Sequence, residues 1–242
     1  MSKETVTVLD LPFINTTNHE FINELKNDIK QSKNIFIVTA NPEIAVYAYD
    51  HPDYKKIIKT ADYITPDGIG IIKASNMIHN PIKERITGFD TLSSLLEIAN
   101  NQNLKIYLLG AKPEVIQKTI VAVNKKYPNA QIVGHHDGYF KDEQAIVDEI
   151  NEVQPNIVAV ALGFPKQEEF IAKHRKVANA IWIGVGGSFD VLSGTVKRAP
   201  KVFQELHLEW LYRFITHPSR LNRFMTLPRF LKLVKESKNA DE

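Results

Sequence analysis

The chain has 242 residues, of which 43% are hydrophobic and 24% charged, so a folded core is expected and global disorder is excluded. It has no cysteine, which excludes a disulfide scaffold, a cysteine nucleophile and a zinc–thiolate site. Its apolar runs are far shorter than the roughly 20 residues of a transmembrane helix, and its first residues do not resemble a secretory signal. We therefore expect no membrane-spanning segment and no leader.

Charge is distributed unevenly along the chain. The net charge is +2, but six Lys or Arg residues and no Asp or Glu lie between residues 213 and 235, which leaves −4 on the rest. A neutral-to-acidic body with a basic end argues against nucleic acid as the main partner. It favours an anionic surface or an anionic substrate at the C-terminal end, with a solvated helix face as the alternative.

The first predicted elements already alternate between strand and helix. A buried β-branched strand is predicted at residues 35–38. A helix is predicted to follow, with Asn41 as its N-cap and Pro42 at its first position. A short strand over residues 62–65 then ends in the turn Pro66-Asp67-Gly68.

The later strands complete an α/β pattern. They are predicted at residues 105–109, 131–133, 157–162 and 180–185. Because these strands are nearly unbroken apolar runs, we predict a Rossmann-like, mostly parallel sheet with helices on both faces. Strand signals stop near residue 198, so we expect an α/β catalytic domain over residues 1–198 and a basic helical appendage over 199–242. Pro218 and Pro228 are expected to divide the appendage into short helices.

Several familiar motifs are absent. The chain contains no phosphate loop of the form G-x-x-x-x-G-K-[ST], no G-x-S-x-G elbow and no Asp-x-Asp pair. Residues 184–187 resemble the opening of a dinucleotide fingerprint, but Phe189 replaces the third glycine and the motif follows the last strand. His135-His136-Asp137 is a poor chelate, because adjacent side chains on an extended chain point to opposite faces. We predict no metal site.

Polar residues gather instead on the loops that follow the strands, where open α/β sheets bind ligands. They are Thr39, Asn41, Asp67, Arg85, Lys166, Gln167 and Asp190. Each has a structural alternative: a helix cap for Asn41, a turn brace for Asp67, and a cap or local ion pair for Asp190. The glycines at 110, 163 and 186–187 would leave room for a diphosphate at helix N-termini.

Eight short segments then carry a family resemblance, in order along almost the whole chain. They are residues 39–43, 66–70, 84–90, 107–111, 137–140, 163–168, 184–190 and 198–200. Together they resemble the WecG/TagA/CpsF glycosyltransferases (glycosyltransferase family 26), and most of all the enzymes of the teichoic acid linkage unit. Residues 208–213 and 218–220 are similar to the family's C-terminal appendage, whereas Phe164 stands where a smaller residue is more usual.

The resemblance implies a reaction and a place in the cell. It implies an inverting transfer of N-acetylmannosamine from UDP-ManNAc to N-acetylglucosaminyl diphospho-undecaprenol, with a β(1→4) linkage and no metal or other cofactor. It further implies a cytoplasmic enzyme, peripheral on the inner face of the plasma membrane, with an anionic membrane surface as partner and with homo-oligomers left open.

Three alternatives to this reaction also stay open. They are a related UDP-sugar donor with another polyprenyl-diphosphate acceptor, a non-catalytic membrane scaffold, and another Rossmann-type enzyme. Residues 39–43 disfavour the last, because they occupy the place of its glycine fingerprint.

The family also implies roles for individual residues. By analogy, Asp67 is the base that takes the proton of the acceptor hydroxyl. Arg85 is the first candidate to meet the departing UDP, because its planar fork suits phosphate oxygens. Lys166 and the Gly186–Gly187 amides are further candidates for this role. Thr39, Asn41 and Gln167 are expected to hold sugar hydroxyls or the acetamido group, and Gly110 and Asp190 complete the expected substrate-binding set.

The C-terminal end is expected to meet the acceptor. Arg213, Arg220 and Arg223 are predicted to face the lipid diphosphate or the anionic leaflet, at about 1 kcal/mol for each basic residue. The apolar residues nearby are Leu221, Phe224, Met225, Leu227, Phe230, Leu231 and Leu233. Seating in the membrane interface and packing on the core or on a neighbouring subunit both stay open for them.

Overall fold

A six-stranded parallel sheet forms the centre of the computed structural model, which describes residues 4–200, 203 and 226–241. Its strands are β3 (Ile35–Ala40), β4 (Tyr63–Pro66), β5 (Lys105–Gly110), β6 (Gln131–His136), β7 (Ile157–Ala161) and β8 (Ile181–Gly184). They lie in the order β4-β3-β8-β7-β5-β6, and every neighbouring pair is parallel. The predicted fold class is therefore confirmed.

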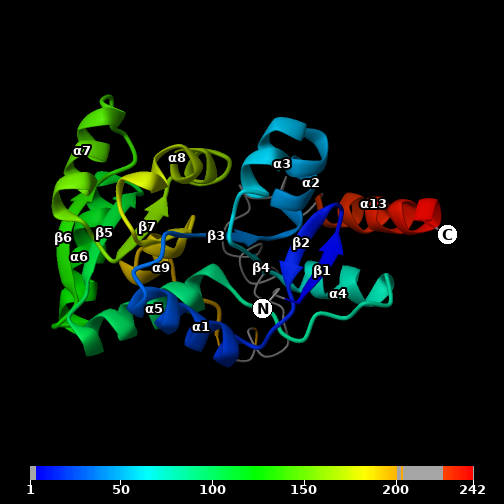
Figure 1. Cartoon of the computed structure of the whole chain (residues 1–242), viewed down its shortest axis with the longest axis horizontal. Coiled ribbons are helices and arrows are strands. Elements are labelled where there is room, and N and C mark those ends of the chain that lie inside the picture. The colour runs from blue at the N-terminus through cyan, green and yellow to red at the C-terminus, as the bar shows by residue number, and fades with distance from the viewer. Residues whose placement is uncertain (1–3, 201–202, 204–225, 242) are drawn as a thin grey trace.

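Helices cover both faces of this sheet (Figure 1). One face carries α1 (Asn18–Lys30), α5 (Gly88–Gln102), α6 (Pro113–Lys126) and α9 (Ser188–Leu192). The other carries α2 (Pro42–Asp50), α3 (Pro52–Ile58), α4 (Ile69–Met77), α7 (Glu143–Val153) and α8 (Lys166–His174), with a 3₁₀ turn at Arg175–Val177. Phe36 and Val38 point into one apolar cluster and Ile35 and Ile37 into the other. This alternation explains the unbroken apolar run of the strand, since neither face meets water.

An N-terminal hairpin was not among the predicted elements. It pairs β1 (Thr5–Val8) with β2 (Leu11–Ile14) in antiparallel register and lies beside β4. Leu11 and Phe13 are completely buried in the cluster below it. Each strand has only four residues, which is short for detection by pattern, but Val6 and Val8 alternate with exposed threonines as a half-buried strand does.

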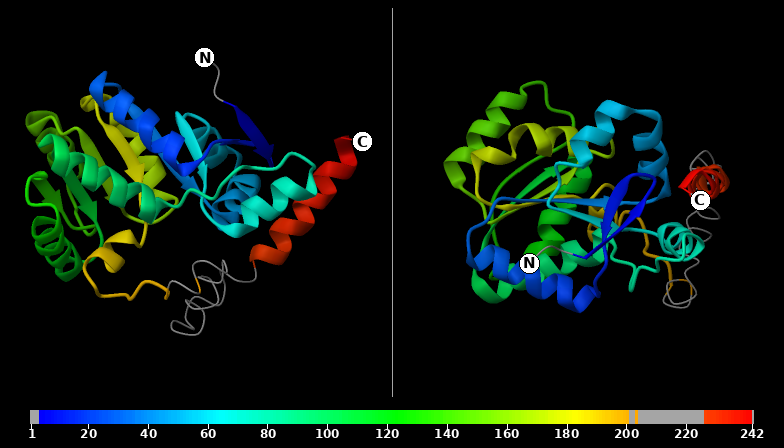
Figure 2. Two further views of the ribbon diagram at one scale, coloured as in Figure 1. Left: turned by 90° about the horizontal axis from the view of Figure 1, so that it is seen from below. Right: turned by 45° about the vertical axis from the view of Figure 1, so that its right-hand side comes forward.

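The C-terminal helix α13 (Thr226–Asp241) packs on the core (Figure 2). It lies against α2 and α4, its Phe230 is 0% exposed, and Arg229 makes two hydrogen bonds of 2.7 Å to Asp50. Leu227, Leu231 and Leu233 are partly buried against the same cluster. For these four apolar residues the structure supports core packing, not membrane seating.

The predicted helix division and domain boundary at the C-terminal end both stay predictions. Pro228 lies in the first turn of α13, where proline removes no helical hydrogen bond, and residues 204–225 lie outside the described part of the chain, so the predicted division at Pro228 stays a prediction. Pro218, Leu221, Phe224 and Met225 lie outside the described residues. The division at residues 198 and 199 stays a prediction.

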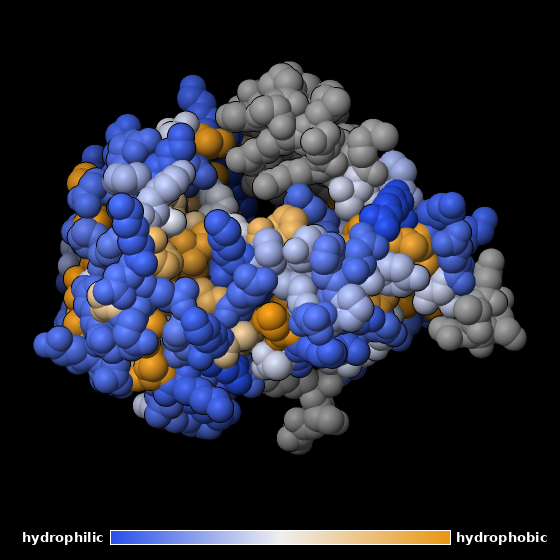
Figure 3. All heavy atoms as spheres, turned by 90° about the horizontal axis from the view of Figure 1, so that it is seen from above, coloured by the Kyte–Doolittle hydropathy of each residue, from blue (hydrophilic) through white to orange (hydrophobic). Residues whose placement is uncertain are grey.

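The described surface is predominantly hydrophilic on the face shown in Figure 3, where apolar side chains appear as scattered patches. No described helix is both long and apolar enough to cross a membrane.

Removal of the Phe230 ring is expected to weaken the docking of α13. Because this ring is fully buried, Phe230→Ala should lower the free energy of unfolding by about 3–5 kcal/mol. If α13 detaches before the rest of the protein unfolds, the variant should instead be cleaved by protease within α13. Thermal unfolding and limited proteolysis would measure the effect. Lys232→Ala, on the same helix with a 75% exposed side chain, is the matched control. Equal melting and cleavage of the two variants would contradict this packing.

Candidate active site

A cleft of about 1280 Å³ opens at the carboxyl ends of the strands. Nine sequence-predicted residues line it: Thr39, Asn41, Asp67, Arg85, Lys166, Gln167, Gly186, Gly187 and Asp190. Ligand pockets in proteins typically measure about 300–1,000 Å³, so this cleft is larger than a typical pocket for one small molecule. Gly110 is not in the lining. It ends β5 with a φ of +118°, and a Cβ there would lie 2.5 Å from the Ala161 backbone, so this position requires glycine.

Asp67 follows β4 and its carboxylate meets the start of α5. Its backbone N–H donates to the Ala40 carbonyl at 2.9 Å, which places the residue beside the end of β3. Its Oδ2 accepts the N–H of Gly88, the first residue of α5, at 3.0 Å. This N–H is one of the helix donors with no partner inside the helix, and it lies at the positive end of the helix dipole. The carboxylate is therefore held and electrostatically stabilised at the cleft wall.

The two polar residues at the end of β3 also have structural roles. The Thr39 hydroxyl donates to the Gly184 carbonyl at 3.0 Å and so joins β3 to the end of β8. Asn41 caps α2, with its Oδ1 accepting the Ile44 N–H at 3.0 Å. The cap uses only the oxygen of the Asn41 amide, so the nitrogen remains a donor for a substrate.

Arg85 lies on the loop between α4 and α5, and its neighbours anchor that loop. The Lys83 N–H donates to the Asn15 Oδ1 at 2.9 Å, and the Glu84 carboxylate accepts the Asn18 N–H at 2.7 Å. Both partners belong to the segment that leads from β2 into α1. The half-buried Arg85 is thus brought to the cleft by contacts distant in sequence.

The start of α8 is fastened to the loop after β8. Gln167 is 3% exposed, and its Oε1 accepts the Gly186 N–H at 3.0 Å. Its Nε2 donates to Glu168 Oε1 at 2.7 Å. Burial raises the pKa of Glu168 to about 7, against the opposing effects of the Gln167 amide and the Tyr54 hydroxyl. Lys166, one residue earlier, is exposed at the cleft.

Arg198 and Tyr139 are among the cleft residues to which the sequence assigned no role. Arg198 donates to Asp90 at 2.6 Å and lies over the Phe89 ring at 4.5 Å. Tyr139 is 68% exposed and also lines the cleft. Both residues lie within segments that carry the family resemblance, and this resemblance is the sequence signal that could have identified them. The sequence analysis uses Arg198 only to mark a domain boundary. The predicted Arg213, Arg220 and Arg223 lie outside the described residues.

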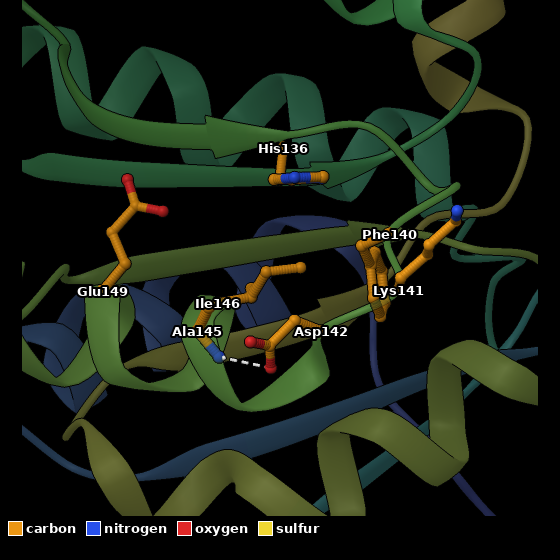
Figure 4. Close-up of a pocket in the computed structure, with 7 residues that line it drawn as sticks. All are labelled: His136, Phe140, Lys141, Asp142, Ala145, Ile146 and Glu149. Carbon is orange, nitrogen blue, oxygen red and sulfur yellow. Dashed lines mark hydrogen bonds between the residues drawn. The ribbon is translucent and has the colours of Figure 1, made fainter.

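A smaller hollow of about 340 Å³ lies at the end of β6 (Figure 4). His136 and Phe140 line it, and Asp142 caps α7 by accepting the Ala145 N–H at 3.1 Å. It contains none of the sequence-predicted site residues. Across residues 4–200, 203 and 226–241, no group of three or more His, Asp or Glu side chains is arranged to hold a metal ion.

This cleft at the carboxyl edge of a parallel sheet belongs to a glycosyltransferase. The chain is a member of the WecG/TagA/CpsF family of glycosyl transferases, whose model matches residues 6–241, so the family resemblance is confirmed.

Two relatives carry the same specific name, N-acetylglucosaminyldiphosphoundecaprenol N-acetyl-beta-D-mannosaminyltransferase. The chain is 41% identical over 239 residues to that of Bacillus subtilis (strain 168), covering 98% of this chain and 93% of the relative. It is 36% identical over 236 residues to that of Staphylococcus aureus (strain NCTC 8325 / PS 47), covering 96% and 93%.

Burial of Glu168 predicts a pH-dependent stability. Because its folded-state pKa of about 7 exceeds the ordinary 4.5, the favourable contribution is fully present below about pH 4.5 and is lost as the pH rises through 7. Glu168→Gln does not titrate, so its stability relative to wild type should rise by roughly 2–3 kcal/mol between pH 5 and pH 8. Denaturant unfolding at both pH values measures this, with the exposed Glu152→Gln as control. A constant difference between Glu168→Gln and wild type would contradict the burial effect.

Proposed function

We propose that the chain transfers N-acetylmannosamine from UDP-ManNAc to N-acetylglucosaminyl diphospho-undecaprenol, with inversion to a β(1→4) linkage, in synthesis of the teichoic acid linkage unit. The observation that carries this proposal is the Asp67 carboxylate, held by the Gly88 N–H in a cleft of about 1280 Å³. The specific name shared by relatives that match almost the whole chain supports the choice of donor sugar and acceptor.

The chemistry assigned to Asp67 is that of a base. Inversion takes one displacement at the anomeric carbon, in which the acceptor hydroxyl enters opposite the departing UDP. Asp67 accepts the hydroxyl proton as the new bond forms. Its negative charge also stabilises the positive charge that develops on the sugar ring, as a carboxylate does in glycoside cleavage.

The departing UDP gathers negative charge, which fixed positive groups stabilise. In this proposal Arg85, Lys166 and the Gly186 and Gly187 amides, which all line the cleft, meet the diphosphate. Thr39, Asn41 and Gln167 lie close to the donor sugar, and Asp190 lies near the nucleotide. Losing one contact in such a preorganised site typically lowers turnover by about 10²–10³-fold.

The acceptor is attached to a membrane lipid, so the proposed enzyme works at a membrane surface. We place it on the inner face of the plasma membrane as a peripheral protein. Arg213, Arg220 and Arg223 would then face the lipid diphosphate or the anionic leaflet. Their positions lie outside the described part of the chain, so this role rests on charge alone.

Asp67→Asn separates catalysis from binding. The amide keeps the shape of the side chain but cannot accept the proton at neutral pH, so turnover should fall by about 10³-fold or more while UDP affinity changes little. Turnover assays and calorimetry with UDP measure the two effects. Asp53→Asn, at an exposed position on α3, is the control. A parallel loss of UDP binding would assign Asp67 a structural role instead.

Transfer in EDTA tests the proposed function as a whole. Because cationic side chains and backbone amides are proposed to receive the UDP, the purified protein should bind UDP and form the disaccharide lipid without a divalent cation. The assay uses UDP-ManNAc and a shortened lipid acceptor. UDP-GlcNAc in place of UDP-ManNAc is the control for donor choice, and it should give at least tenfold less product. Absence of UDP binding would favour the membrane scaffold, and equal use of both donors would overturn the specificity for mannosamine.

A further inference from the structure

We propose that Glu168 is a positioning residue, whose carboxylate sets the orientation of the Gln167 amide and thereby holds the Gly186–Gly187 loop ready for a diphosphate. The part that concerns the diphosphate rests on the proposed function. The hydrogen-bond relay from Glu168 through Gln167 to Gly186 is independent of it.

The relay works in only one direction. A backbone N–H is a donor, so the atom of Gln167 that faces Gly186 must be the amide oxygen, at 3.0 Å. The amide nitrogen then faces Glu168, whose Oε1 accepts from it at 2.7 Å. A primary amide can rotate by about 180°, which exchanges its oxygen and nitrogen with almost no change of shape. An acceptor facing the nitrogen therefore selects one of the two orientations. Glu168 is that acceptor.

Close packing leaves the Gln167 side chain little freedom to respond in another way. It is 3% exposed, and a Cβ at Gly184 would lie 2.8 Å from its Nε2. Gly186 adopts a left-handed φ of +47°, so the loop bends immediately after the strand at the residue that the amide holds. Rotation of the amide would bring its NH₂ group against the Gly186 N–H, and this N–H would lose its acceptor.

If the only role of the Glu168 side chain were packing, a carboxylate at this position would lower the stability of the fold without any benefit. Glu168 is 0% exposed, and its Oε2 makes no hydrogen bond of normal geometry in the described part of the protein, although the Tyr54 hydroxyl lies near enough to lower the pKa of the carboxyl group. A buried carboxylate that lacks full pairing destabilises a fold, and an apolar residue of similar volume would do better. The orientation of Gln167 supplies the reason for keeping it.

Protonation of Glu168 does not interrupt the relay. The groups that affect its ionisation are Gln167 and Glu169 on α8 and Tyr54 on α3. A proton placed on Oε2 leaves Oε1 free to accept from Gln167, so the amide keeps its orientation on both sides of neutral pH.

The experiment compares two substitutions of Glu168. Glu168→Gln keeps an oxygen acceptor at the same place, whereas Glu168→Leu has none. Amide hydrogen exchange at Gly186 reads the relay directly, calorimetry with UDP reads its consequence, and thermal unfolding monitors the fold. Asp28→Asn is the matched control, because Asp28 is another buried carboxylate, bonded to the Tyr63 hydroxyl at 2.6 Å and outside the cleft lining.

We expect Glu168→Gln and Asp28→Asn to retain wild-type exchange at Gly186 and UDP affinity within about threefold. Glu168→Leu should exchange at least tenfold faster at Gly186 and bind UDP at least tenfold more weakly while still unfolding cooperatively. If Glu168→Leu does not fold, Glu168→Asp, whose shorter side chain cannot reach Gln167, carries the same expectations.

Unchanged exchange at Gly186 in Glu168→Leu, or equally fast exchange in Glu168→Gln, would overturn the positioning role. Failure of the wild-type protein to bind UDP would overturn the proposed function instead and leave the exchange comparison decisive for the relay.

Discussion

The parallel alignment of six strands, most of them apolar and buried, is the constraint on which the rest of the structure depends. Both faces of the sheet are covered by helices, so the polar residues between elements reach water mainly at the strand ends. Because all strands run the same way, the loops after β3, β4, β7 and β8 open on one edge. Asp67, Gln167 and Gly186 are distant in sequence and share one cleft for this reason.

Structural and substrate-binding roles coincide in the same side chains. Asn41 caps a helix with its oxygen, Thr39 joins two strands, and Asp67 accepts a bond from the start of α5. The helix cap considered for Asn41 is thus a real contact, whereas the Asp67 contact is to Gly88, 21 residues away, and both residues also line the cleft. Such contacts hold the polar groups in place before a substrate arrives, which is what preorganised electrostatic catalysis requires.

Two buried carboxylates show how differently one residue type can be used. Asp28 accepts from both Tyr63 and Lys33, which compensates its loss of water. Glu168 accepts from Gln167 through one oxygen only, and the other oxygen makes no hydrogen bond of normal geometry among the described residues. The first arrangement stabilises the packing of α1 against β4. The second lowers stability at neutral pH and is best understood through the loop that it orients.

The sequence by itself determined the six sheet strands, the helix start at Asn41, the family, and nine of the residues that line the cleft. Local patterns suffice there, because apolar runs, caps and short motifs are properties of neighbouring residues. Only the tertiary structure decided that α13 packs on the core, that Gly110 lies outside the lining, that Arg198 reaches Asp90 and that Glu168 holds Gln167. The docking of α13, the extent of the cleft and the contact of Arg198 with Asp90 each depend on segments that are far apart in the chain. Adjacency in sequence likewise does not reveal that a glutamate is buried with only one oxygen in a hydrogen bond of normal geometry.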